Sequence, residues 1–481
     1  MASVKTNFEY NLILTCCNYI FPLITYPYVS RVLGVNNIGI CNFVDSIIQY
    51  FILFSALGVG SFGVREIARY KDNEKRKNEI FTNLICFNAL MSVIAIIILV
   101  VCTFTLEPLI PYKNYLLLGI LKIVFEVILT SWFFQGVSDF KYITMRSVAV
   151  RTLFVVTVFA FVRDQDDTLV YYFLLCMTVV INALINWRHG IKMRQLNFKY
   201  LKLSKYILPI LSFGGYLLLT SMYTTFNTMF LGFVSGTEEV GYFTTATKLY
   251  SLFLSVFTAF TTVMVPKVSE LLRKGELDKL SSIAKDTFEL VFMCTIPIIA
   301  ICEVYYHEIV YIVSGAGYVG AELPFRIVIF LLLIIGMEQI VIQQFLMAST
   351  SNKAIVTVSI IGASVGVIAN LLFTPVLAST GSAISWGMSE LIVLMVGLVL
   401  VKIIIGIKVK YSLIANSLLI YGVYYLFNNI CKYSIHNAYE SLVVSVCVTG
   451  ILFIVINTYF ARNKFVVEVI RKLAGNKLIE K

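Results

Sequence analysis

Charged side chains stand inside the long apolar runs of this sequence, where they could bind a polar ligand or carry an ion. Asp45 and Lys248 each lie about seven residues into such a run, and Lys122 and Glu126 are spaced four residues apart in another. A charge near the centre of a bilayer costs roughly 2.5–3.5 kcal/mol, so such residues usually face a cavity or a partner. These positions are the first candidates for function.

Polar residues accompany Asp45 and Lys248 at helical spacing, which predicts two polar helix faces. The first face holds Asn42, Asp45, Ser46 and Gln49, and the second holds Thr244, Thr247, Lys248 and Ser251. The two sets stand 202 residues apart, as do Gly34 and Gly236, and Gly39 and Gly241. The preceding runs match at the same offset, with Asn18, Pro22 and Thr25 aligned to Thr220, Thr224 and Asn227. We interpret this as an internal repeat.

Each charge also has a structural interpretation. Lys122 and Glu126 could neutralise each other within one helix, and Arg31 could extend to the headgroups. Lys248 has no acid one turn away in either direction. We therefore expect it to pair with Asp45 across a cavity in the empty state, or with an anionic ligand.

The candidate cavity residues are Arg31, Asn42, Asp45, Gln49, Lys122, Glu126, Asn227, Thr244, Lys248, Ser251 and Gln339. The candidate ion-coupling residues are Asp45, Glu126, Glu338 and Glu390, for which structural hydrogen bonding is the alternative. The ten cysteines form no Cys-x-x-Cys pair and the three histidines are scattered. We expect no metal, no cofactor and no catalytic residue.

Composition indicates how these residues are positioned. Hydrophobic residues make up 59% of the 481 and charged residues 14%, against about 25% charge in soluble proteins. This composition predicts an all-α membrane protein with several spans. The first apolar run, from about Phe8, lacks a small-residue cleavage site, so we expect no cleavable signal. We expect fourteen spans, at about 8–29, 38–60, 80–104, 115–134, 147–162, 169–187, 207–233, 241–265, 287–306, 325–348, 355–375, 382–401, 412–430 and 441–460.

Charge sets the expected orientation. Most of the 38 Lys and Arg residues fall in one alternate set of connections, such as 64–79, 188–205 and 266–279. The positive-inside rule places this set, and both termini, in the cytoplasm. The net charge of +11 therefore predicts orientation and no nucleic-acid partner.

The repeat predicts two pseudo-symmetric six-helix lobes around a central cavity, related by an axis along the membrane normal. The expected domains are an N-terminal lobe at 1–190, a C-terminal lobe at 200–405, two further helices at 411–461 and a cytoplasmic tail at 462–481.

The stretch from Pro27 resembles the Wzx-type polysaccharide (O-antigen) flippases of the multidrug/oligosaccharidyl-lipid/polysaccharide exporter superfamily. The similar residues are Pro27, Ser30 to Gly34, Gly39 and Arg65 to Ala68, with weaker likeness at 132–140 and 238–250. The resemblance implies fourteen helices and alternating access in a bacterial inner membrane. It implies export of undecaprenyl-pyrophosphate-linked oligosaccharide to the outer leaflet, coupling to a proton or Na⁺, and a polysaccharide polymerase as partner.

Two other functions remain open. A drug or cation antiporter of the same superfamily would use Asp45 and Glu126 for coupling. A membrane polymerase or glycosyltransferase would need a large outer loop, whereas no connection here exceeds about 20 residues. Such short connections leave no room for a separate catalytic domain, so we do not expect an enzyme.

Overall fold

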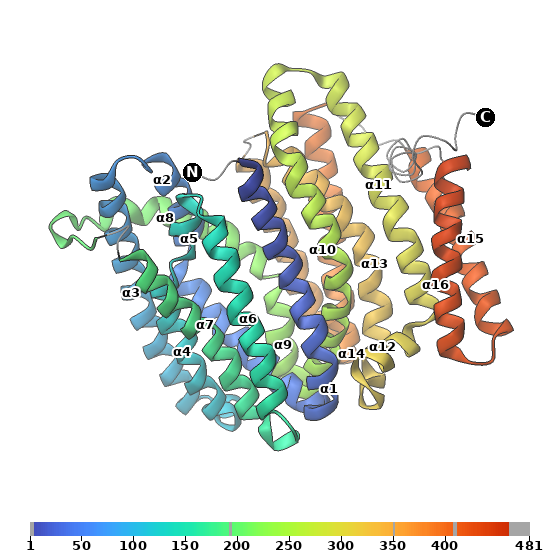
Figure 1. Cartoon of the computed structure of the whole chain (residues 1–481), viewed down its shortest axis with the longest axis horizontal. Coiled ribbons are helices and arrows are strands. Elements are labelled where there is room, and N and C mark those ends of the chain that lie inside the picture. Colours follow the sequence, from blue (N-terminus) through green and yellow to red (C-terminus); the bar gives the residue numbers. More distant parts are fainter. Residues whose placement is uncertain (1–3, 192–194, 350–351, 407–410, 461–481) are drawn as a thin grey trace. The chain divides into compact units, whose positions relative to one another are not determined.

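The computed structural model describes residues 4–191, 195–349, 352–406 and 411–460. Within these ranges the chain forms helices and no strands (Figure 1). Helices are the expected outcome for long apolar runs, because a bilayer offers no water to satisfy backbone N–H and C=O groups.

The α-helices are α1 Val4–Ala56, α2 Val59–Arg69, α3 Glu74–Thr105, α4 Lys113–Leu129, α5 Ser131–Gly136, α6 Phe140–Phe161, α7 Thr168–Gly190, α8 Ser204–Ser221, α9 Thr225–Ser235, α10 Thr237–Lys274, α11 Leu277–Val304, α12 Tyr306–Ser314, α13 Glu322–Glu338, α14 Asn352–Ile404, α15 Tyr411–Ser434 and α16 Ala438–Val455. The 3₁₀ turns are η1 Glu107–Tyr112, η2 Gln165–Asp167, η3 Phe198–Tyr200 and η4 Ala316–Ala321. Two segments, η5 Gln339–Leu346 and η6 Ile456–Phe460, are π-helical.

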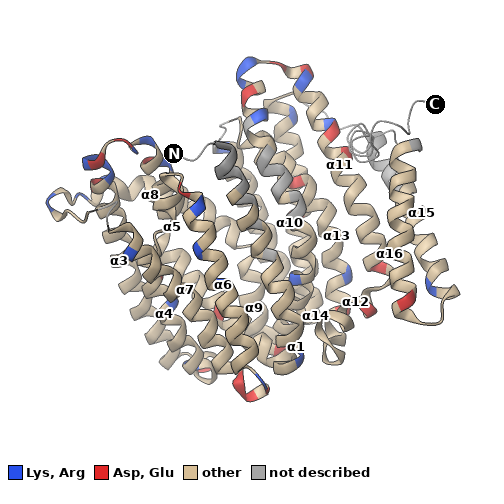
Figure 2. Ribbon diagram, in the orientation of Figure 1, with Lys and Arg blue, Asp and Glu red and all other residues tan. Residues whose placement is uncertain are grey.

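Nine of the described helical stretches are long and apolar enough to cross a membrane, or ten if the bent pair α8 and α9 forms one span. Charged residues gather at the ends of helices and are sparse along their lengths (Figure 2). The prediction of an all-α multi-pass membrane protein is confirmed.

Two of the longest helices contain a break. Gly34 interrupts α1 with φ 77° and ψ 169°, and Ala378 interrupts α14 with φ 48° and ψ −125°. Across the second break the hydroxyls of Thr374 and Ser382 lie 3.2 Å apart. Eight residues of unbroken helix would separate them by about 12 Å, so α14 reverses direction at Ala378.

The break in α1 has a counterpart in the proposed repeat. Gly236, which precedes α10, has φ 89° and ψ 174°, close to the values at Gly34. Both φ angles are positive, in the range that favours glycine. The sequence alignment at an offset of 202 residues therefore pairs two glycines with the same unusual backbone.

The chain forms two compact units. The first comprises residues 1–255, 313–324 and 359–389, and the second comprises 256–312, 325–358 and 390–481. These units group residues that pack together, whereas the expected lobes at 1–190 and 200–405 rest on internal symmetry and stay a prediction. The expected tail at 462–481 lies outside the described residues.

Each unit has its own apolar core. In the first, a large cluster joins α2, α3, α5 and α8 through residues such as Phe62, Phe81, Phe133 and Ile210. In the second, Phe292, Ile296 and Ala300 of α11 pack with Tyr424 of α15. Burial of such aromatic and aliphatic groups fixes the helices that carry the polar residues.

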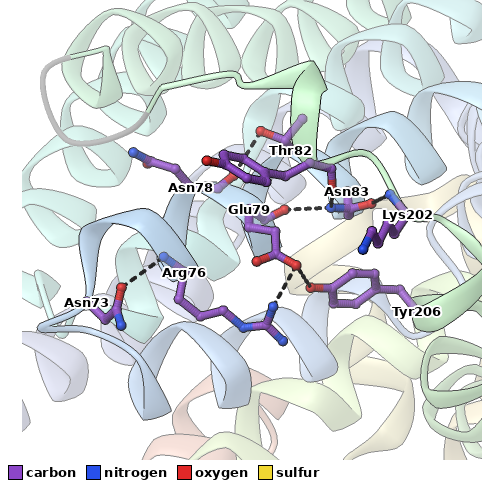
Figure 3. Close-up of polar contacts among 9 residues, drawn as sticks. Asn73, Arg76, Asn78, Glu79, Thr82, Asn83, Lys202 and Tyr206 are labelled. Carbon is purple, nitrogen blue, oxygen red and sulfur yellow. Dashed lines mark hydrogen bonds and ion pairs between the residues drawn. The ribbon is translucent and has the colours of Figure 1, made fainter.

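The connection between α7 and α8 is attached to the start of α3 (Figure 3). The Asn83 side chain donates to the Tyr200 carbonyl over 3.0 Å and accepts from the Lys202 N–H over 2.7 Å. Tyr206 donates to Glu79 over 3.4 Å, and Glu79 also pairs with Arg76 at 2.6 Å. This connection joins the two halves of the proposed repeat.

Candidate functional site

A cavity of about 210 Å³ lies in the first unit, between α1 and α10. Its lining residues are Asn18, Pro22, Leu23, Tyr26, Pro27, Lys248, Leu249, Ser251, Leu252 and Val313. Pro22 and Pro27 lack the N–H groups that would bond the carbonyls of Asn18 and Leu23 within α1. The two carbonyls thus lose their helical N–H partners, and the surface that lines the cavity is mostly apolar.

Lys248 enters this cavity from α10. Its Nζ atom lies 4.4 Å from the centroid of the Tyr26 ring, which is a cation–π contact. The Tyr26 hydroxyl lies 2.5 Å from the hydroxyl of Thr245 and is buried. Of the described carboxylates, none forms an ion pair with Lys248. The arrangement leaves a half-buried cation beside an open volume.

Asp45 pairs with Lys122 instead of with Lys248. The Asp45 side chain comes from the second half of α1 and is 45% exposed, whereas that of Lys122, in α4, is 10% exposed. Lys122 also lies 5.3 Å from the ring centroid of Tyr172. The expected contact between Asp45 and Lys248 is therefore absent from this conformation, and Lys122 takes a partner outside its own helix rather than Glu126.

Several other predicted cavity residues bond locally. Asn42 donates to the Ile38 carbonyl over 2.7 Å, Thr244 to Val240 over 2.8 Å and Ser251 to Lys248 over 2.8 Å. In each bond the side chain donates to a backbone carbonyl of its own helix, so its oxygen stays available as an acceptor. Gln49 is exposed. Of this group Ser251 lines the cavity.

Asn227 belongs to a buried hydrogen-bond network in the first unit. Its amide oxygen accepts from Asn370 over 2.5 Å, and Asn370 accepts in turn from Thr374 over 2.9 Å. Asn227 is 1% exposed. It fixes α9 against α14 and does not line the cavity.

The remaining predicted residues fall in two places. Gln339 donates to Thr258 over 2.9 Å in the second unit, where the half-buried carboxyl group of Glu338 lies close to that of Glu390. Arg31 is exposed and donates to the Pro27 carbonyl over 2.9 Å.

Sequence reasoning missed Tyr26 as a functional candidate. The signal was available, because Asn18, Pro22 and Tyr26 recur every four residues and so share a helix face. The ring of Tyr26 covers the ammonium group of Lys248.

Comparison with known proteins agrees with this architecture. A family model described as polysaccharide biosynthesis protein matches residues 4–272. A protein provisionally named an O-antigen transporter in Escherichia coli (strain K12) is 23% identical over 56% of this chain and 66% of its own length. One of the same name from Shigella dysenteriae is 21% identical over 56% of this chain and 68% of its own length. The chain thus spans about two thirds of these relatives.

Solved structures show the same fold at low identity. Lipid II flippase MurJ, in an inward closed conformation, has a TM-score of 0.77 with 14% identity over 94% of this chain and 99% of its own. An inward-facing multidrug resistance MATE family transporter of the MOP superfamily has a TM-score of 0.61 with 17% identity, over 84% of this chain and 96% of its own. The chain therefore shares the fold of these two transporters.

The chain belongs to the polysaccharide biosynthesis protein family, whose model matches more than half of its length.

Proposed function

We propose that this protein moves an undecaprenyl-pyrophosphate-linked oligosaccharide repeat unit from the cytoplasmic to the outer leaflet of the bacterial inner membrane by alternating access. The observation that carries the proposal is Lys248, a cation with no carboxylate partner among the described residues, at a cavity in a MOP-type fold. Family membership and relatives named as O-antigen transporters support a polysaccharide substrate.

A single charged group in a mostly apolar cavity suits the anionic head of such a lipid. An ammonium group forms charge-assisted hydrogen bonds with diphosphate oxygens, and the side chains of Asn18 and Ser251 suit sugar hydroxyls. The volume of about 210 Å³ is below the roughly 300–1,000 Å³ of a pocket for a drug-sized ligand. In this conformation it would therefore hold the diphosphate and adjoining sugar atoms rather than a whole repeat unit.

Binding would exchange one partner of Lys248 for another. In the empty cavity the Tyr26 ring stabilises the ammonium group, and an arriving diphosphate would replace that contact with a stronger one. A ligand shifts a conformational equilibrium only through such a difference in affinity between states. Asp45, paired with Lys122, would border the path without neutralising Lys248.

The fourteen spans follow if each broken helix counts twice. The breaks at Gly34 and Ala378 would divide α1 and α14 into two spans each. The four resulting spans add to the other seven apolar stretches described. The bent pair α8 and α9, helix α10 and helix α15 supply the last three spans. Both termini would then be cytoplasmic, with six-helix lobes at 1–190 and 200–405.

Transport would be coupled to a proton or Na⁺. Two carboxyl groups that lie close together inside a helix bundle favour sharing one proton, so Glu338 and Glu390 are candidate carriers, together with Asp45 and Glu126. A polysaccharide polymerase would use the exported unit.

A binding measurement separates this function from a drug antiporter. Purified protein is mixed with undecaprenyl diphosphate, undecaprenyl monophosphate or the hydrophobic cation tetraphenylphosphonium. We expect the diphosphate to bind most tightly and to lose at least tenfold in affinity in Lys248→Ala. Tight binding of the cation without binding of the diphosphate would favour the antiporter.

A further inference from the structure

The second half of α1 crosses the start of α10 at very short range. A Cβ atom added to Gly39 would overlap the carbonyl oxygen of Thr237, and one added to Gly241 would overlap that of Val35. The Thr237 hydroxyl also donates to the side-chain oxygen of Asn36 over 2.5 Å. Any side chain larger than hydrogen at position 39 or 241 would force the two helices apart.

The contact is reciprocal within the proposed repeat. Val35 and Thr237, like Gly39 and Gly241, are 202 residues apart. Gly39 meets Thr237, which follows Gly236, and Gly241 meets Val35, which follows Gly34. A two-fold axis produces such a pairing, because the same two positions then meet twice, once in each direction. The crossing thus lies at the axis that would relate the halves.

The crossing stands between one end of the helices and the cavity. Proceeding along α10 from Gly241, Thr245 bonds to Tyr26, and Lys248 and Ser251 then line the cavity. Tyr318, within η4 in the same unit, donates to the Ser30 carbonyl over 3.1 Å and adds to this closed end. All of these contacts lie within the first unit.

We infer that the reciprocal crossing of Gly39 and Gly241 is the outer gate of the cavity, closed in this structure. The inference rests on the proposed function for the direction of transport. Hydrogen bonds between Asn36 and Thr237 and between Tyr26 and Thr245 cross the gate, and Tyr318 bonds to Ser30 beside it. At the centre of the crossing the two backbones pack directly against each other. The gate can part and re-form as a unit, because packed interfaces tend to be bistable.

Cross-linking tests whether the gate must open. In an export-competent background with the ten native cysteines replaced by alanine, Asn36→Cys and Thr237→Cys should form a disulfide on oxidation. We expect export to fall at least tenfold and to recover with reductant. A matched pair, Asn37→Cys and Gln165→Cys, joins α1 to η2, where Asn37 donates to the Gln165 carbonyl over 3.1 Å. This pair should cross-link without loss of export.

Thiol labelling tests the gate without any transport. Ser251→Cys, in the same background on intact cells, should be shielded from an impermeant maleimide added outside. Adding Gly39→Val should raise its labelling rate at least tenfold, because the valine holds the crossing apart. Adding Gly60→Val should not, since a Cβ atom at Gly60 meets nothing within 4 Å.

Two results would overturn the gate. One is full export with the disulfide between positions 36 and 237 quantitatively formed. The other is a folded Gly39→Val protein whose introduced thiol at position 251 labels no faster than the same thiol in the Gly60→Val control. The labelling result does not depend on the substrate, so it separates failure of the gate from failure of the proposed function.

Discussion

At the scale of single residues, the proposed function depends on the local environment of Lys248. The sequence allowed its importance to be predicted, because a lysine with no acid one turn away needs another partner. The partner predicted for the empty state was Asp45, whereas the ammonium group contacts Tyr26. Both residues are distant in the chain, and packing determines which of them reaches Lys248. For the same reason the pair of Asp45 and Lys122 was not foreseen.

Replacing Lys248 should affect export more than protein level. Hydrogen bonds to charged groups contribute about 1.5–3 kcal/mol, or roughly ten- to hundredfold in affinity. Lys248→Ala should therefore lower surface polysaccharide at least tenfold at normal abundance, and Lys248→Arg should retain much of it. Lys353→Ala, which changes an exposed lysine of α14, is the control. Equal polysaccharide in all strains would make Lys248 structural.

The ion pair of Asp45 and Lys122 should behave as a coupled unit. Asp45→Asn or Lys122→Met alone leaves one charge without its partner in an apolar helix bundle. Each single change should lower the melting temperature in detergent, and the double variant should lower it by less than the sum of the two single effects. A coupling energy of roughly 0.5–3 kcal/mol is expected. Strictly additive effects would contradict the pairing.

At the scale of elements, hydropathy was sufficient to predict the helices because long apolar runs must be helical in a bilayer. The connection predicted at 30–37 contains Gly34, and that at 376–381 contains Ala378, where the structure places the breaks. The π-helical segment Gln339–Leu346 was not predicted, because its hydrogen-bond shift leaves no mark on hydropathy.

The turn at Ala378 gives a stability prediction. Its φ of 48° is unfavourable for a residue with a Cβ atom, at a cost of about 1–3 kcal/mol. Ala378→Gly should therefore raise the melting temperature in detergent. Ala363→Gly, within the helical part of α14, should lower it, because glycine costs about 1 kcal/mol in a helix. A lower melting temperature for Ala378→Gly would argue against the strained turn.

At the scale of the whole molecule, sequence symmetry and packing give different divisions. The repeat aligns residues 202 positions apart, while close contacts draw part of α10 into the first compact unit. Contact density cannot be predicted from a repeat, because equivalent segments such as those at Gly39 and Gly241 can pack as tightly as a core.

We predict the orientation in the membrane from the distribution of Lys and Arg. Reporter fusions at positions 165, 237 and 379 should report the outer side, and fusions at 72, 197 and 272 should report the cytoplasm. The measurement uses paired reporters that are active on opposite sides. Reversal at any two positions would contradict the fourteen-span topology.

The central claim is that this chain moves lipid-linked oligosaccharide across a membrane, with Lys248 binding its diphosphate. The most direct measurement uses vesicles containing fluorescent undecaprenyl-diphosphate oligosaccharide and a membrane-impermeant quencher. We predict that wild-type protein makes the inner-leaflet lipid accessible, that Lys248→Arg does so more slowly, and that Lys248→Ala remains close to protein-free vesicles. Wild-type movement no faster than in protein-free vesicles, or an equal rate with Lys248→Ala, would contradict the account.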